Sequence, residues 1–311
     1  MKTFRVSASF ALALLAASFA TALAQGPQRN STTSDLEDEI DELVIDARQD
    51  YNLEGISITA TRGTKMVFNR AYGDADLDAS RELTPGTSML TGSISQAMLG
   101  AAVMRLVQQR ELRLDTNVEN YLDIPVRNPS FPDTPITLRM LVTHTSSIVD
   151  NPDVEIEPYA TYDEDPEVSL AELAEGYLVP GGDYYFEDNF ANTKPGQTYA
   201  FSRSGAALVG YIVEEVTGES LDDFCQREIW GPLNLSETGY LLSSVTDRKL
   251  ALPYIWDEDS EESVTAGQVM VPEYPATTLH SNSQDLARFL VMIGSRGAYR
   301  GTRILSTSSV R

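Results

Sequence analysis

The sequence predicts an α+β fold, in which an antiparallel sheet is flanked by helices and accompanied by an all-helical region. Two runs rich in β-branched residues, 55–62 and 65–73, are separated by Gly63-Thr64, and this pattern is typical of a β-hairpin. Apolar residues at helical spacing precede the hairpin and fill most of the segments after it. Two strands alone do not make a stable sheet. We therefore expect a fold that lacks its C-terminal strands, since no good partner strand follows the hairpin before Arg311.

The first 24 residues have the features of a secretory signal peptide. Two cations lie among the first five residues, and an apolar run that ends in Ala-Leu-Ala follows them; it is too short to span a membrane. We expect cleavage near Ala24 and a secreted protein, extracellular or, in a bacterium, periplasmic. The alternative is a retained N-terminal anchor. Residues 25–33 are polar and are expected to form a disordered lead-in to one domain, 34–311, that is incomplete at its C-terminus.

The charge and the residue content exclude several classes of partner and cofactor. The formal net charge is −23 over 311 residues, which repels nucleic acid and anionic lipid, so we expect neither nucleic-acid nor membrane binding once the signal is removed. The single cysteine, Cys225, excludes an internal disulfide and is expected to be a small buried hydrophobic residue. With only two histidines, His144 and His280, no zinc site and no cofactor are expected.

Helices are predicted from apolar periodicity and from their end signals. The segment from Ser93 to about Gln109 is apolar on nearly every face, which is typical of a buried helix. Residues 150–190 are acidic and are expected to be an irregular loop, as are 74–86 and 256–262. Further helices are expected after a capping box of Ser34 with Glu37, over 136–144, from 204 to 217 with a stop at Gly218, over 221–230 and over 281–297.

Ser93 is the first candidate for chemistry. It follows a glycine in TGSIS and opens the buried helix, and a helix N-terminus is a favourable place for a nucleophile because its N–H groups stabilise developing negative charge. The structural alternative is that Ser93 only caps the helix. Three residues later, where a lysine could take its proton, stands Gln96, whose neutral amide cannot act as a base.

A series of segments in a fixed order resembles the serine β-lactamase and penicillin-binding-protein-like hydrolases, in the branch with class C β-lactamases, D,D-peptidases and related esterases. The resemblance covers roughly residues 35 to 311. The segments, in order, are AYGDADL, TGSIS, LRLDTNVENYL, ITLRMLVTHTSSI, PGQTYAFSRSGAALVGYIVEEVTGESL, GPLNLSETGY and SNSQDLARFLVMI.

The resemblance implies three catalytic motifs, and this sequence departs from each. In the Ser-x-x-Lys motif, Ser93 matches the serine but Gln96 replaces the general-base lysine. In the Tyr-x-Asn motif, Phe201 replaces the tyrosine and Arg203 replaces the asparagine. The third motif, a His-x-Gly or Lys-Thr-Gly strand, lies further along than the sequence extends. The resemblance therefore implies a serine-hydrolase-like protein whose catalysis is impaired, a pseudoenzyme in which Ser93 only caps its helix.

Several alternatives stay open at this point. The Arg203 guanidinium suits a small-molecule or peptide carboxylate bound beside Ser93 and Phe201, in the cleft that corresponds to the active site of the resembled family. Alternatively, Arg203 pairs with an acidic side chain of residues 150–190. His144 lies in a stretch that the resemblance implies is structural, behind the site, and His280 has no identifiable partner. The chain could also be an active esterase, amidase or D,D-peptidase with an unrecognised base, or a truncated fragment of a longer hydrolase.

Overall fold

The computed structural model describes residues 33–154, 159–246 and 249–310, with the side chains from residue 36 onward. Contacts divide the chain into two compact units, 1–56 and 57–311. The signal peptide predicted over 1–24, nearly all of the lead-in and the side chain of Ser34 fall outside the described residues. Among the helices that are described, none is both long and apolar enough to cross a membrane.

The described part of the first unit is mainly the helix α2 (Thr33–Asp50), which the apolar periodicity predicted. Its buried residues Ile40, Val44 and Ala47 recur at three- and four-residue intervals and therefore form one stripe. The Arg48 guanidinium donates hydrogen bonds to the carbonyls of Leu53 and Glu54 at 3.1 and 2.8 Å, and these bonds close the turn that follows the helix.

The predicted hairpin is present as strands β1 (Gly55–Arg62) and β2 (Lys65–Asp76). A third strand, β3 (Arg81–Glu82), pairs antiparallel with β2, so the sheet order is β1-β2-β3. The expectation that 74–86 is only loop is therefore wrong, although β3 is two residues long. The hydroxyls of Ser57 and Thr59 on β1 share hydrogen bonds with Ser283 Oγ, at 2.7 and 2.9 Å, which ties β1 to the start of helix α10.

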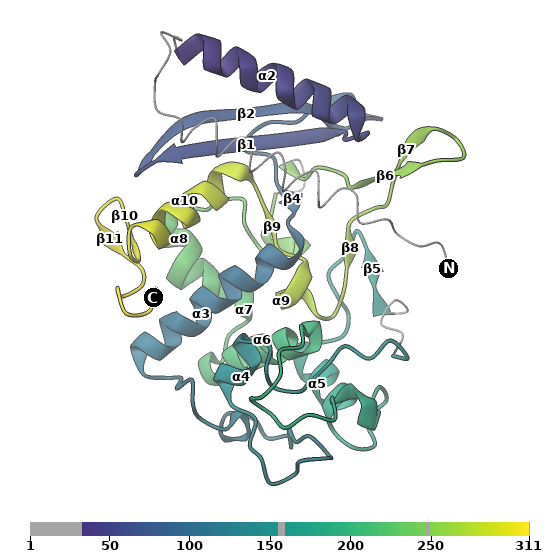
Figure 1. Ribbon diagram of the computed structural model, residues 1–311, viewed down its shortest axis with the longest axis vertical. Coiled ribbons are helices and arrows are strands. Elements are labelled where there is room, and N and C mark those ends of the chain that lie inside the picture. The colour runs from purple at the N-terminus through teal and green to yellow at the C-terminus, as the bar shows by residue number, and fades with distance from the viewer. Residues whose placement is uncertain (1–32, 155–158, 247–248, 311) are drawn as a thin grey trace. The chain divides into compact units, whose positions relative to one another are not determined.

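Helix α6 (Arg203–Thr217) lies in the middle of the helical region and contacts α3, α4, α5, α7 and α9 (Figure 1). It ends at Gly218, whose positive φ of 70° is the left-handed cap that the sequence predicted. Gly210 permits close packing, because a Cβ there would lie 2.6 Å from Pro275. The other helices are α3 (Ser95–Gln109), α4 (Leu138–Val142), α5 (Leu170–Leu178), α7 (Leu221–Cys225), α8 (Gly231–Leu233), α9 (Tyr274–Thr277) and α10 (Ser283–Gly294).

Two segments that were predicted to be irregular contain regular structure. Helix α5 begins within 150–190 at a capping box, in which the Ser169 hydroxyl accepts from the Glu172 N–H and the Glu172 carboxylate accepts from the Ser169 N–H. The Ser-x-x-Glu signal was present, but the acidic composition of the segment concealed it. The acidic segment 256–262 belongs to a second hairpin, formed by β6 (Tyr254–Asp257) and β7 (Glu262–Thr265), and contains the end of β6, the turn and the start of β7.

The remaining strands form short pairs outside the three-stranded sheet. Each strand of these pairs is two residues long, so each pair only holds two segments together locally and does not extend the three-stranded sheet. They are β4 (Met89–Leu90) with β9 (His280–Ser281), β5 (Thr161–Tyr162) with β8 (Val269–Met270), and β10 (Ala298–Tyr299) with β11 (Thr302–Arg303).

Cys225 tests the packing of the helical region. It ends α7, is fully buried and forms no disulfide, and burial raises the pKa of its thiol well above the ordinary value. A maleimide should therefore label the folded protein far more slowly than the protein in denaturant. Equal labelling rates in the two conditions would show that this face of α7 is not packed.

Candidate active site

Ser93 lies in a 3₁₀ turn, Gly92–Ile94, that leads into α3. Its side chain is exposed, and the cap positions of the turn and of α3 belong to Thr91 and Ile94. The prediction that Ser93 caps the buried helix is therefore wrong. The serine that holds this turn is Ser95, which is fully buried; its Oγ donates to the Gly92 carbonyl and accepts from the Leu279 N–H at 3.0 Å.

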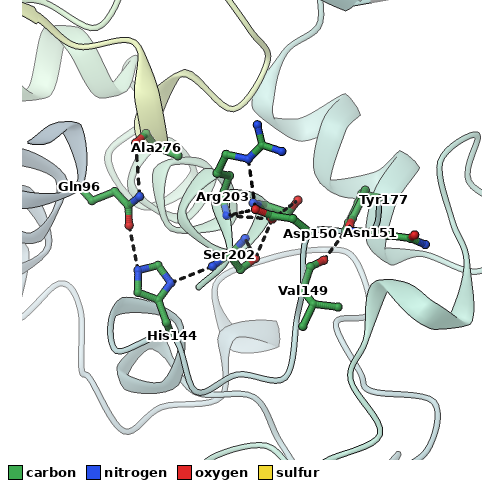
Figure 2. A network of polar contacts seen from close by, with 11 residues as sticks. Gln96, His144, Val149, Asp150, Asn151, Tyr177, Ser202, Arg203 and Ala276 are labelled. Atoms are coloured by element: carbon green, nitrogen blue, oxygen red, sulfur yellow. Dashed lines mark hydrogen bonds and ion pairs between the residues drawn. The ribbon is translucent and has the colours of Figure 1, made fainter. Parts of the chain in front are cut away.

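Gln96, one helical turn after Ser93, uses both ends of its amide in hydrogen bonds (Figure 2). Its Oε1 lies 2.9 Å from His144 Nε2, and its Nε2 donates to the carbonyl of Ala276 at 3.3 Å. These bonds link the start of α3 to the end of α4 and to α9. At the position where the resemblance implies a lysine, the structure thus has a neutral side chain that already forms hydrogen bonds with its neighbours.

His144 connects the two segments that were predicted to carry the site. Its Nδ1 accepts from the backbone N–H of Ser202 at 3.3 Å, so in the neutral ring the proton is on Nε2, which donates to Gln96. The ring also packs against Phe201, with 4.9 Å between centroids, and against the edge of Tyr199. Burial lowers the pKa of His144, and the nearby Asp150 carboxylate only partly opposes this. His144 is a satisfied neutral histidine, as expected, but it lies between the motif segments.

Asp150 holds the N-terminus of α6. Its carboxylate accepts hydrogen bonds from the backbone N–H groups of Arg203, at 2.8 and 3.0 Å, and of Ser204, at 3.1 Å. The hydroxyls of Ser202 and Ser204 add two longer bonds of 3.3 Å. A carboxylate at this position also interacts favourably with the helix dipole. On the other flank, Ser202 Oγ accepts from the Gly205 N–H at 2.8 Å, so the first turn of α6 is capped twice.

Arg203 forms an ion pair with Asp150, through its Nε at 3.2 Å from Oδ2. The sequence left two alternatives for Arg203, a bound carboxylate ligand or an ion pair with an acidic side chain of residues 150–190, and the structure shows the ion pair. The Arg203 side chain is 42% exposed and that of Asp150 is 23% exposed. Asp150 itself was not singled out in the sequence, because it is one of many carboxylates in the same acidic stretch.

Glu273 lies beside this pair and is fully buried. Among the described residues, neither of its carboxyl oxygens has a hydrogen-bond partner. Burial raises the pKa of Glu273, the Arg203 charge opposes the shift, and the Asp150 charge adds to it. Glu273 therefore favours its neutral form more than an exposed glutamate does.

The backbone around Asp150 is held from the other side by Tyr177. The Tyr177 hydroxyl donates to the carbonyl of Val149 at 2.7 Å and accepts from the N–H of Asn151 at 2.8 Å, as Figure 2 shows. Because these two residues flank Asp150, the buried tyrosine fixes the stretch of chain that presents the carboxylate to α6.

The other ionisable candidates lie at positions outside the motifs. His280 is buried in β9, and its Nε2 lies 3.3 Å from Gln268 Oε1, a partner that the sequence did not identify. Burial lowers the pKa of His280 to about 4. Lys249 is paired with Glu237. The described residues contain no cluster of three or more histidine, cysteine or acidic side chains that could hold a metal ion.

We expect Asp150 to contribute much of the stability of this region. Replacing Asp150 with Ala should lower the free energy of unfolding by about 2 kcal/mol, because the first N–H groups of α6 and the Arg203 side chain lose a partly buried acceptor. Replacing it with Asn should cost less, since one carbonyl oxygen remains. Urea denaturation measures both. Asp115→Ala is the matched control, because it breaks an exposed ion pair with Arg139 and should have little effect. Equal losses for Asp150→Ala and Asp115→Ala would contradict the role assigned to Asp150.

Comparisons with known proteins identify the family of the chain. A family model described as Beta-lactamase matches residues 40–310. The chain is 22% identical over 258 residues to Protein flp of Staphylococcus aureus strain N315, which covers 83% of this chain and 49% of that protein. The chain thus spans about half the length of the curated relatives it matches.

Solved structures show the same fold. The octameric penicillin-binding protein homologue from Pyrococcus abyssi superposes with a TM-score of 0.68 and 24% identity, covering 88% of this chain and 58% of that one. The hydrolase EstCE1, described as having promiscuous acyltransferase activity, superposes with a TM-score of 0.69 and 18% identity, covering 89% and 76%. The predicted α+β, β-lactamase-like fold is confirmed. Because the family model matches almost the whole described chain, this protein belongs to the beta-lactamase family of serine hydrolase-like proteins.

Proposed function

We propose that this member of the beta-lactamase family does not acylate Ser93 at a useful rate, and that it binds a small molecule or peptide in the cleft where relatives carry out catalysis. The observation that carries the proposal is the pair formed by Gln96 and His144. A serine hydroxyl is a weak nucleophile until a base takes its proton, and neither member of this pair has a lone pair suited to that task.

The groups at the predicted motif positions, and the histidine that joins them, are each unsuited to proton transfer. The Gln96 amide is not basic at any ordinary pH. His144 has its one basic lone pair, on Nδ1, directed at the N–H of Ser202. Phe201 has no hydroxyl that could pass a proton to a leaving group. A positioned acid or base contributes about 10²–10⁴-fold to a rate, so the loss of two such groups reduces acylation by several orders of magnitude.

A second candidate function is hydrolysis through another base. The observation in its favour is the position of Ser93, which is exposed in the 3₁₀ turn leading into α3, where the helix dipole favours developing negative charge. Its relative EstCE1 is described as a hydrolase. This candidate function requires a base for the Ser93 proton, and neither Gln96 nor His144 supplies one.

Covalent probes separate these two functions. The full chain should be incubated with a fluorescent fluorophosphonate and, separately, with a fluorescent penicillin, and then run on a denaturing gel beside an active penicillin-binding protein. We expect no label above that of the Ser93→Ala variant, because the Ser93 hydroxyl keeps its proton. Stoichiometric labelling that Ser93→Ala abolishes would overturn the proposal and support a hydrolase with a different base.

A further inference from the structure

The segment that carries Phe201 presents alternate side chains to the solvent. Ser202 is 1% exposed and adopts extended backbone angles of −144° and 121°. Its neighbours Phe201 and Arg203 therefore lie on the opposite side of the chain, and their exposed fractions are 44% for Phe201 and 42% for the Arg203 side chain. Tyr199, two residues earlier, is 66% exposed. Tyr199, Phe201 and Arg203 thus form a row of exposed side chains at alternate positions along the chain, two aromatic and the last cationic.

The aromatic part of this row is held in place from behind. The His144 ring packs against Phe201, with 4.9 Å between centroids, and against Tyr199, with 5.9 Å. His144 is itself fixed by its hydrogen bonds to Gln96 and to the backbone of Ser202. Two exposed rings on a rigid support lose little conformational freedom when a ligand packs against them. Exposed aromatic residues are individually common on protein surfaces. Whether these two belong to a ligand site therefore depends on the cation at the end of the row.

The Arg203 guanidinium is oriented but not saturated. Only its Nε–H donates to a described residue, the carboxylate of Asp150, and Figure 2 shows the terminal nitrogens extending beyond that bond. The buried carboxyl of Glu273 lies nearby but accepts no hydrogen bond from it. The edge formed by Nη1 and Nη2 is therefore fixed in direction and open, and two parallel N–H groups match the two oxygens of a carboxylate.

We propose that Tyr199, Phe201 and Arg203 form a site for a monocarboxylate that carries an aromatic or alkyl group. The carboxylate binds the open edge of the guanidinium, and the apolar group packs against Phe201 and Tyr199. The inference names the ligand class for the proposed function and rests on it. On a chain with a net charge of −23, an organic anion is repelled in general, and an arginine held in a fixed direction supplies the local attraction that binding requires.

The test compares ligands that differ either in the charge or in the aromatic group. Isothermal titration calorimetry of the full chain with 3-phenylpropionate, 3-phenylpropanamide and acetate measures the carboxylate and the ring separately. We expect 3-phenylpropionate to bind at least about tenfold more tightly than either of the other two, because it alone makes both the charge-assisted bonds and the ring contact. Equal affinities for the acid and the amide, or no binding of the acid, would overturn the proposal.

Variants assign the binding to these residues. Arg203→Gln should weaken 3-phenylpropionate about tenfold, and Phe201→Ala should bring its affinity close to that of acetate. Arg227→Gln is the matched control, because Arg227 also pairs with carboxylates and lies over an aromatic ring, Phe224, at 5.5 Å; binding should not change. An unchanged affinity in Arg203→Gln would contradict the site. If the probes label Ser93, the proposed lack of acylation is refuted whether or not the carboxylate binds. If the probes do not label Ser93 and 3-phenylpropionate does not bind, only this inference is refuted.

Discussion

The structure of the site depends on one neutral histidine ring. Through its two nitrogens, His144 joins the side chain of Gln96 to the backbone of Ser202, and so it connects the first turns of α3 and α6, near which the resemblance places the first two motifs. His144 follows the short helix α4 and has a positive φ of 54°, a conformation that a non-glycine residue adopts only when its surroundings fix it. The three bonded groups therefore hold one another in position.

The replacements at the motif positions are compatible with one another. A glutamine in place of the family lysine can accept from a neutral histidine, whereas a charged lysine would offer only donors to the same ring nitrogen. Similarly, an arginine at position 203 brings a cation to the start of α6, and Asp150 supplies both its counter-charge and the cap of that helix. Gln96, His144 and Asp150 thus have their polar groups paired, whereas the open edge of Arg203 is left for a ligand, which supports a role in binding and not in proton transfer.

The sequence predicted the helices and strands whose signals lie within the element itself. The hairpin of β1 and β2 followed from β-branched runs around Gly63-Thr64, and α6 followed from its apolar periodicity and from the left-handed cap at Gly218. The short helix α5 was missed although its Ser-x-x-Glu signal is local, because the surrounding acidic residues suggested a loop.

The site was predicted less completely, because its main contacts join residues far apart in the sequence. The motif positions of Ser93, Gln96, Phe201 and Arg203 were found by resemblance, and their catalytic roles stay predictions. No periodicity or spacing indicates that His144 bonds to a side chain 48 residues away, or which carboxylate among many caps α6. Ser95 was overlooked for a different reason: its neighbour at position 93 has the motif role, and only the fold shows which hydroxyl is buried.

The protonation state of His144 tests the central claim most directly, because a ring whose Nδ1 accepts from a backbone N–H cannot also serve as a base. Nitrogen-15 NMR of the histidine rings measures it, with His280→Gln to assign the two signals. We predict that at neutral pH His144 carries its proton on Nε2, and that it becomes charged only below its ordinary pKa because burial opposes the charge. A proton on Nδ1, or a pKa at or above the ordinary value, would contradict the account.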